Sequence, residues 1–342
     1  MENETNVNEI QIHDKIEENN TDKEQIITEI QYHDKIEELK RKVSSVIIGQ
    51  ERMLELLLTA VLADGHTLIE GVPGVAKTLT ARLLAKLINA DFSRIQFTSD
   101  LMPSDVLGTN VFNVATGHFE FHKGPAFGDI ILVDEINRAP AKTQSALFEL
   151  MEERQTTIDG ECHKMGDIYT IVATQNPIEQ EGTYRLPEAQ LDRFLFKINI
   201  GYPSIEDEVE IIKAHNENKR FTKLEGILPI LTKENLLELR QTASKIFIDN
   251  KMIRYITLLI NETRTNKSIY VGASPRASIA FLQAAKAYAL INGRSFVIPD
   301  DIKTLAYPIL SHRIILTAEA EMEGLTVERV IKEMIERVEV PK

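Results

Sequence analysis

Residues 71–78 have the composition of a loop that binds nucleotide phosphates. They read Gly-Val-Pro-Gly-Val-Ala-Lys-Thr, between a short apolar run and an amphipathic stretch, which is the strand–loop–helix order that such a loop needs. Gly71 and Gly74 allow the backbone to turn its N–H groups toward phosphate at a helix N-terminus. Lys77 supplies positive charge for the β- and γ-phosphates, and the Thr78 hydroxyl is a candidate ligand for Mg²⁺.

One position departs from the usual pattern, which has glycine immediately before the lysine. This chain has Ala76 there. A methyl group is tolerated if the residue keeps φ below zero at the start of the helix, so we expect that conformation for Ala76. A glycine-rich turn with an incidental lysine is the alternative interpretation of the motif.

Two acids, Asp134 and Glu135, directly follow the apolar run 130–133. A buried parallel strand delivers the residues after it to the carboxyl edge of its sheet, where α/β proteins bind ligands. Asp134 is therefore a candidate for holding Mg²⁺, mostly through water, and Glu135 is the candidate general base for the attacking water. A strand that runs into an acidic loop is the simpler alternative, but the pair follows Lys77 in the order that one nucleotide site requires.

Two further polar residues could act on the same nucleotide. Asn176 follows the apolar run 169–174, and at that strand tip it would lie between the phosphate loop and the carboxylates and orient the lytic water. A turn asparagine before proline is the alternative. Arg193 could stabilise γ-phosphate charge across a subunit boundary as an arginine finger, or form a surface salt bridge with Asp192 or Glu188.

Arg276 occupies an unusual place for a positive side chain. Ser274 fits a helix N-cap and Pro275 fits the first helical position, so Arg276 falls in the first turn. The helix dipole disfavours a cation at that end. We therefore expect Arg276 to face an anion, namely the nucleotide.

The elements that must position these residues alternate between short apolar runs and amphipathic stretches. The runs are residues 67–70, 130–133, 169–173 and 196–200. Helical stretches such as 78–88 and 143–153 lie between several of them. This alternation predicts an α/β fold with a parallel sheet covered on both faces.

Two segments interrupt the alternation with signals for β-hairpins. Residues 111–121 read VFNV-ATG-HFEF, two alternating runs around a glycine turn. Residues 156–169 contain Asp159-Gly160, a dipeptide typical of tight hairpin turns. We predict two hairpins inserted into the α/β core.

The chain divides into three predicted parts. Residues 1–36 form an acidic arm, residues 37–203 a nucleotide-binding αβα core, and residues 204–342 an all-α lid. Helix-opening residues precede the apolar-periodic runs of the lid: Ser204, Thr232, Asp249, Ser274, Pro299 and Thr326.

The arm contains a near-repeat, because residues 8–19 (NEIQIHDKIEEN) and 28–39 (TEIQYHDKIEEL) match at nine of twelve positions. It is either a duplicated acidic tail, disordered or weakly helical, or a docking arm with two copies of one recognition helix.

Composition narrows the classes of function. The 342 residues suggest two domains, and the net charge of −13 disfavours sequence-independent binding of DNA. The single cysteine, Cys162, excludes an internal disulfide framework and a cysteine-rich zinc site. The sequence starts with no secretory signal and contains no apolar stretch long enough to cross a bilayer, so we expect a cytoplasmic protein.

Taken together, these motifs resemble the AAA+ ATPases, and specifically the MoxR family. The matching stretches are Gly71–Thr78, Gln96–Gly108, Gly124–Phe127, Asp134–Asp159, Ala173–Tyr184, Leu186–Leu195 and Ser274–Ala277. The resemblance implies a Walker A loop with Lys77 and Thr78, a Walker B pair Asp134 and Glu135, sensor-1 Asn176, arginine finger Arg193 and sensor-2 Arg276. It further implies nucleotide contacts from Gly49, Gln50, Gly71, Val72, Pro73, Gly74, Val75, Ala76 and Leu79. Ala76 is usual in this family.

The resemblance also implies an activity. It is that of a ring-forming, Mg²⁺-dependent ATPase, typically a hexamer, that remodels or matures partner complexes, often with proteins that contain a von Willebrand factor A domain. A ring motor on nucleic acid and a nucleotide-gated scaffold with little turnover are the alternatives; the net charge disfavours the first and the intact Glu135 the second. Two departures stand out: the acidic arm, and Arg185 where the family has proline. Arg185 and Arg138 are therefore further candidates for a role between subunits.

Overall fold

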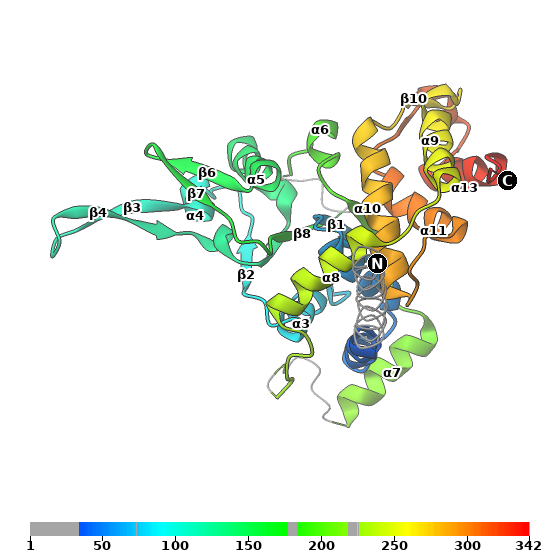
Figure 1. Cartoon of the computed structure of the whole chain (residues 1–342). Coiled ribbons are helices and arrows are strands. Elements are labelled where there is room, and N and C mark those ends of the chain that lie inside the picture. Colours follow the sequence, from blue (N-terminus) through cyan, green and yellow to red (C-terminus); the bar gives the residue numbers. More distant parts are fainter. Residues whose placement is uncertain (1–33, 73, 177–182, 218–223, 225, 342) are drawn as a thin grey trace, which may run out of the picture.

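The computed structural model describes residues 34–72, 74–176, 183–217, 224 and 226–341. Its core is a five-stranded parallel sheet with the order β2-β5-β8-β1-β9. The strands are β1 (Thr67–Gly71), β2 (Phe92–Gln96), β5 (Ile130–Asp134), β8 (Thr170–Gln175) and β9 (Phe196–Ile200). The four predicted apolar runs are thus confirmed as strands (Figure 1).

Helices cover both faces of the sheet, as predicted. Ile130 and Leu132 of β5 belong to the core built with α2 (Glu51–Leu62) and α3 (Lys77–Leu87). Ile131 and Val133 belong to the opposite core, which α5 (Ala141–Glu153) completes. Because successive side chains of a strand point to opposite faces, a strand buried on both sides reads as a continuous apolar run.

Strand β2 was not predicted from the sequence. It lies at the edge of the sheet, and only Ile95 of its five residues is buried. An edge strand with one solvated face need not be apolar throughout, so β2 carries no run that marks it. Its exposed residues Arg94 and Gln96 instead point toward the end of β5, as described below.

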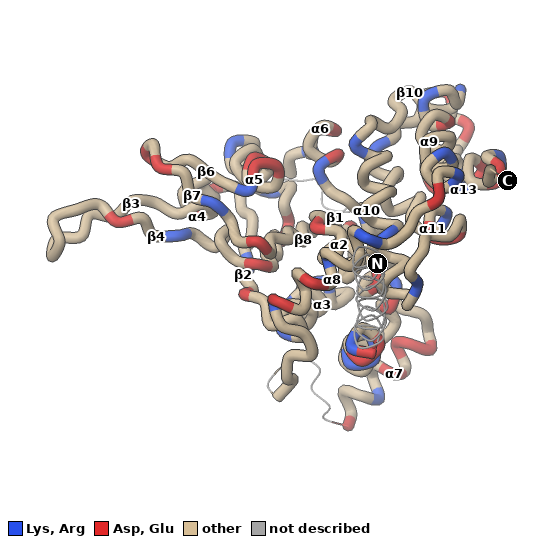
Figure 2. Tube along the Cα trace, in the orientation of Figure 1, with Lys and Arg blue, Asp and Glu red and all other residues tan. Residues whose placement is uncertain are grey.

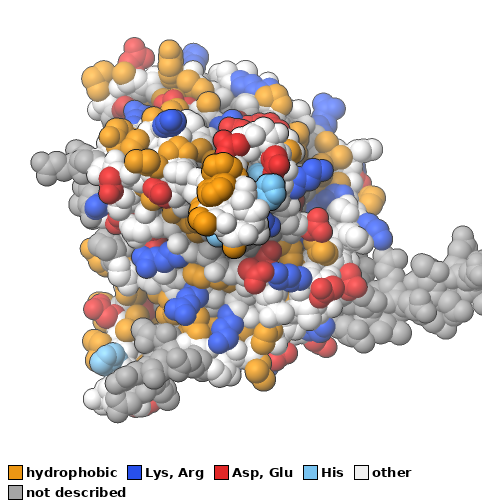
Figure 3. Space-filling model, turned by 90° about the vertical axis from the view of Figure 1, so that its left-hand side faces the viewer, with side chains coloured by type: hydrophobic (Ala, Val, Ile, Leu, Met, Phe, Trp, Pro, Cys, Tyr) orange, Lys and Arg blue, Asp and Glu red, His pale blue; other side chains and the backbone are white. Residues whose placement is uncertain are grey.

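Both predicted hairpins are present. The first pairs β3 (Gly108–Asn113) with β4 (His118–Lys123), between α4 (Pro103–Leu107) and the 3₁₀ turn η1 (Pro125–Phe127). It projects far from the core and carries few charged residues (Figures 1 and 2). Hydrophobic side chains gather where it points toward the viewer in Figure 3. The second hairpin pairs β6 (Gln155–Ile158) with β7 (Glu161–Lys164) around Asp159-Gly160, both at positive φ.

The lid is helical as predicted, except for a two-stranded ladder of β10 (Ile269–Val271) and β11 (Ile315–Leu316) that the sequence analysis did not predict. Its helices are α7 (Ile205–Asn216), α8 (Lys233–Lys245), α9 (Asn250–Thr265), α10 (Pro275–Ile291), α11 (Pro299–Leu310), α12 (Ala318–Met322) and α13 (Val327–Arg337). The expected N-caps are confirmed at Ser204, Thr232, Asp249, Ser274 and Thr326, and Pro299 is the first residue of α11. Within the described ranges, no helix combines the length and apolarity that a bilayer crossing requires.

The end of the second repeat copy belongs to the folded core. Residues 34–44 are helical, and Ile36, Leu39 and Val43 are buried. The Lys40 amine donates to the backbone oxygen of Ile291, which ties this helix to the end of α10. The predicted boundary between residues 36 and 37 therefore falls inside a helix. The first repeat copy lies outside the described residues.

The repeat provides a matched test of this packing. Ile36→Ala removes a fully buried side chain and should lower the free energy of unfolding by roughly 2–5 kcal/mol. Ile16→Ala changes the equivalent position of the first copy, in the segment expected to add nothing to the core, and should leave unfolding in urea unchanged. Equal losses in the two variants would show that both copies pack.

Candidate functional site

The phosphate loop connects β1 to α3, but its backbone differs from our expectation. Ala76 has φ of 57° and ψ of 19°, in the left-handed region, so the expectation of a negative φ is wrong. Gly74 also has a positive φ, of 87°. A left-handed conformation costs a non-glycine residue on the order of 1–2 kcal/mol. Such strain typically persists at functional sites, where it orients groups toward a ligand. Pro73 lies outside the described residues.

Lys77 lies among carboxylates at the carboxyl edge of the sheet. Its amine donates to the backbone oxygen of Gly71 at 2.7 Å. Burial lowers the pKa of Lys77, and the nearby carboxylates of Asp134, Glu135 and Glu70 oppose that shift. The structure therefore brings the loop lysine and the acidic pair together, as the order of the motifs predicted.

A threonine at the end of β8 joins the two acids. The Thr174 hydroxyl donates to Oδ1 of Asp134 at 3.1 Å and accepts from the Glu135 N–H at 3.0 Å. Asp134 is buried, and Glu135 has a left-handed φ of 57°. Strand β8 lies between β5 and β1, which confirms the predicted place of Asn176 between the acids and the phosphate loop.

Two side chains of β2 clamp the acidic pair from the other side. Arg94 Nε donates to Oδ2 of Asp134 at 2.6 Å, and Arg94 Nη2 donates to Oε1 of Gln96 at 3.1 Å. Gln96 Nε2 in turn donates to Oε2 of Glu135 at 2.8 Å. Arg138 Nε forms an ion pair with the same Glu135 oxygen at 3.0 Å. Both carboxylates are therefore engaged, by residues that the sequence analysis did not assign to this contact.

The oxygens at this edge suit a magnesium ion. Mg²⁺ prefers carboxylate, hydroxyl and water ligands over nitrogen and sulfur. The Asp134 carboxylate ends β5, and Thr78 lies in the first turn of α3, beside Lys77. Each Asp134 oxygen accepts one hydrogen bond from the protein and keeps a second lone pair. Thr78 and Asp134 thus fit the role expected of them.

Two of the residues expected to contact the nucleotide, Gly49 and Gln50, lie where the core meets the lid. A Cβ atom on Gly49 would come within 2.6 Å of Asp207 Oδ2, so Gly49 lies against the first turn of α7. Gln50 is the N-cap residue of α2. Val72 and Leu79 are partly buried against the apolar core.

Arg193 and Arg276 meet on one carboxylate. Arg193 Nε donates to Glu152 Oε2 at 2.7 Å, and Arg276 Nη2 donates to Glu152 Oε1 at 2.6 Å. The hydrogen bond from Arg193, with the smaller contributions of both charges, lowers the pKa of Glu152. The alternative considered for Arg193, a salt bridge with Asp192 or Glu188, is not the one formed: Arg193 pairs with Glu152, while Asp192 pairs with Arg313 and Glu188 with Arg185.

This arginine pair lies at the sheet edge opposite the phosphate loop. Arg193 lies three residues before Phe196, which pairs with Thr67 at the start of β1, whereas the phosphate loop follows Gly71. At 3.3 Å per residue, β1 alone separates the two edges by about 13 Å. The other candidates differ: Arg138 contacts Glu135 of its own chain, and the exposed Arg185 pairs with Glu188 at 3.4 Å.

Comparison with known proteins agrees with this geometry. Residues 66–196 match the model of the ATPase family associated with various cellular activities (AAA), and residues 261–334 match an AAA lid domain. The chain is 42% identical to Chaperone MoxR1 of Mycobacterium tuberculosis, over 88% of this chain and 81% of that protein. It is 28% identical to Protein MoxR of Paracoccus denitrificans, over 82% and 88%. The structure of a putative ATPase from Cytophaga hutchinsonii superposes with a TM-score of 0.86 at 43% identity, covering 94% of this chain and 99% of that one.

The Thr174 hydroxyl provides a test of the acidic pair. Thr174→Val keeps the shape of the side chain but leaves the Glu135 N–H and Asp134 Oδ1 without this partner. We expect ATP turnover to fall at least about tenfold, since a base displaced by about 1 Å loses much of its efficiency. Thr174→Ser, which retains the hydroxyl, should remain near the wild-type rate. Equal activity of the two variants in a steady-state assay would exclude a positioning role.

Proposed function

The chain belongs to the MoxR family of AAA+ ATPases, and we propose that it binds ATP with Mg²⁺ at the carboxyl edge of its sheet and hydrolyses it to ADP and phosphate. One observation carries this proposal. The strand order β5-β8-β1 brings Asp134, Asn176 and Lys77 from three separate motifs to one edge. A loop for phosphate, oxygens for a cation and a carboxylate base are what phosphoryl transfer to water requires.

Each residue then has one role in the reaction. The loop N–H groups and the Lys77 amine bind the β- and γ-phosphates. Thr78 and Asp134 would hold Mg²⁺, which when bound neutralises charge on the phosphate oxygens. Glu135 accepts a proton from the attacking water, which Asn176 orients.

The present contacts of Glu135 constrain this mechanism. Its Oε2 atom accepts a hydrogen bond from Gln96 and forms an ion pair with Arg138. An oxygen engaged by these two partners is not aimed at a water molecule, so Glu135 must turn at least partly from them before it can act as the base. Nucleotide binding at the adjacent loop is the event expected to cause this.

Arg193 and Arg276 serve the site of a neighbouring copy in this proposal. Both lie at the edge opposite the phosphate loop of their own chain, so neither reaches its own γ-phosphate. A ring of copies, which we propose to be a hexamer, places this edge of one chain against the nucleotide edge of the next. Stabilising the transferred charge in trans is the role of an arginine finger.

The β3–β4 hairpin supports protein clients over nucleic acid. Its exposed side chains include Phe112, Val114 and Phe119, with Val114 86% and Phe119 70% exposed. Residues 111–121 contain no lysine or arginine, whereas sequence-independent binding to nucleic acid depends on such cations. We propose that the hairpin contacts apolar segments of client complexes during remodelling, and that such clients include proteins with a von Willebrand factor A domain.

The general base has a direct test. Glu135→Gln keeps the size of the side chain but cannot accept the proton, so turnover should fall at least ~10²-fold while ATP binding is retained. Fluorescent-nucleotide binding and phosphate release measure the two effects separately. A turnover close to that of the wild type would place the base elsewhere.

A mixing experiment tests the arginine finger. Lys77→Ala should abolish ATP binding and Arg193→Ala should spare it, yet each protein alone should be nearly inactive, since a finger contributes on the order of 10³-fold or more. In mixed rings, an intact Lys77 site that faces an intact Arg193 neighbour should regain activity. Co-assembly without recovery would contradict a finger in trans at Arg193, and the same mixture with Arg185→Ala then tests the second arginine.

A further inference from the structure

Helix α7 stands almost free of the rest of the described chain. Ser204 and Asp207 form a capping box at its start, and every residue of the helix except Asp207 and Ala214 is exposed. The exposed residues include large apolar ones: Ile205 is 78% exposed, Val209 43% and Ile212 61%. In Figure 1 the helix lies at the lower margin of the molecule.

The spacing of these side chains defines an interaction surface. Ile205, Val209 and Ile212 follow at intervals of four and three residues, so they share one face of the helix. A helix of 12 residues is marginal in water unless such a face is packed. The face therefore calls for an apolar partner that the described part of its own chain does not supply.

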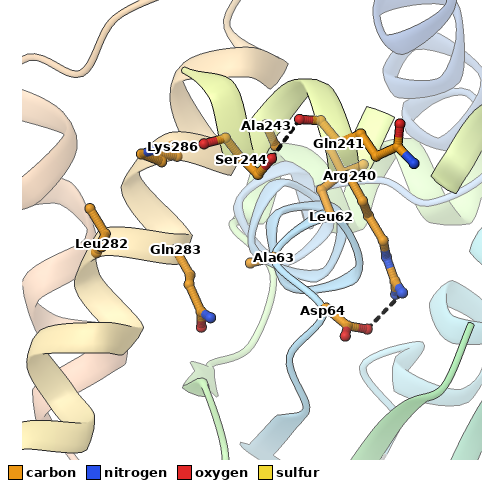
Figure 4. A pocket seen from close by; sticks show the side chains of 10 residues that line it. All are labelled: Leu62, Ala63, Asp64, Arg240, Gln241, Ala243, Ser244, Leu282, Gln283 and Lys286. Carbon is orange, nitrogen blue, oxygen red and sulfur yellow. Dashed lines mark hydrogen bonds and ion pairs between the residues drawn. The ribbon is translucent and has the colours of Figure 1, made fainter. Parts of the chain in front are cut away.

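A groove elsewhere on the molecule suits this face. It lies between the end of α2, α8 and α10, has a volume of about 490 Å³, and its apolar lining includes Leu62, Ala63, Ala243 and Leu282 (Figure 4). Leu282 and Gln283 of α10 form one side of it, across from the α2 residues. We refer to it as the α2–α8–α10 groove.

The charges of the two surfaces are complementary. Helix α7 carries four carboxylates, Glu206, Asp207, Glu208 and Glu210, against one lysine (Figure 2). The groove is lined by two cations, Arg240 and Lys286, and one acid, Asp64, which pairs with Arg240 at 2.6 Å. The Lys286 amine donates to the backbone oxygen of Ser244 and has two further N–H groups for a carboxylate.

The two surfaces also lie near the two parts of the proposed shared site: α7 near the nucleotide edge, and the groove near the edge that carries Arg276. The first turn of α7 lies against Gly49, one of the expected nucleotide contacts. Helix α10 lines the groove with Gln283 and carries Arg276 in its first turn. Arg276, Ile279 and Gln283 are spaced by three and four residues on one face, and Ile279 is 57% exposed. At 1.5 Å per residue, Arg276 lies about 10 Å along α10 from the groove.

We propose that α7 of one copy docks in the α2–α8–α10 groove of a second copy. Ile205, Val209 and Ile212 enter the apolar groove, and the acidic residues of α7 meet Lys286, since Arg240 is engaged by Asp64 and by backbone oxygens of Val61 and Asp167. Because the contact joins two different surfaces, each copy can bind the next in the same way. The copies form a closed ring if the rotation from one to the next adds up to a full turn. This docking rests on the ring of the proposed function. It adds to that function by placing Arg276 of the neighbouring copy beside the nucleotide edge.

Cross-linking between two variants tests the contact. In a Cys162→Ser background without other cysteines, Ile212→Cys and Gln283→Cys proteins are prepared separately and mixed with ATP and a short bismaleimide. A covalent dimer should form in the mixture, while each protein alone should give at least about tenfold less. Replacing Gln283→Cys by Met322→Cys, on an 81% exposed residue of α12, supplies the matched control.

Absence of the specific dimer overturns the proposal, because α7 is then covered otherwise, for example by residues of its own arm. An equal yield with Met322→Cys overturns it too, since random collision then suffices. A small molecule as the natural occupant of the groove would likewise leave the mixture uncross-linked.

An assembly measurement separates this inference from the ATPase proposal. Ile212→Asp places a charge on the apolar face and should shift the protein from ring to monomer mass in light scattering, with association weakened at least about tenfold. Met322→Asp, at a residue that is 81% exposed, should leave the mass unchanged. ATP binding should persist in both variants. Intact rings with Ile212→Asp overturn the docking alone, whereas absence of ATP binding by the unmodified protein contradicts the proposed function.

Discussion

The common direction of five parallel strands is the constraint on which the rest of the structure depends. It sends the ends of β1, β5 and β8 to one edge, with Lys77, Asp134 and Asn176 after or at those ends. It sends the segment before β9, with Arg193, to the other edge. Strand β1 alone separates the two edges by about 13 Å. In the proposed function, the two sets of groups therefore meet only between two copies of the chain.

The acidic pair shows how neighbouring side chains stabilise two adjacent carboxylates. A buried carboxylate is costly unless it is paired and hydrogen-bonded. Arg94 and Thr174 satisfy Asp134, and Gln96 and Arg138 hold Glu135. These partners come from β2, β8 and the turn after β5, so the carboxylates are fixed by the same elements that carry the nucleotide site. Under the proposed function, ATP and Mg²⁺ would have to replace some of these contacts, and this competition would make the site responsive to its ligand.

The parts of this architecture that the sequence revealed share a local cause. Buried strands are apolar runs, helix starts carry capping residues, and Asp159-Gly160 selects a tight turn. The missed parts depend on tertiary structure. Strand β2 is polar because it is an edge, Thr174 matters only through its neighbours, and Glu152 meets two arginines from distant segments. The positive φ of Ala76 opposes its intrinsic preference, so only the geometry of the loop could show it.

The sheet edge that carries Arg193 and Arg276 brings two positive charges close together, and a shared carboxylate offsets their repulsion. Arg193 and Arg276 come from the core and the lid and would repel each other at close range, but Glu152 accepts from both. One carboxylate thus fixes the positions of two guanidinium groups and links the core to the lid. In the proposed ring, a triphosphate on a neighbouring copy would offer more negative charge than Glu152 and so would strengthen the contact between copies. Under the proposed α7 docking, burial of apolar side chains favours association of the copies even without nucleotide. Bound ATP would add a further favourable contribution to the free energy of association. A ligand that binds the assembled form more tightly also stabilises it, so the two proposals together imply that ATP binding and ring assembly reinforce each other.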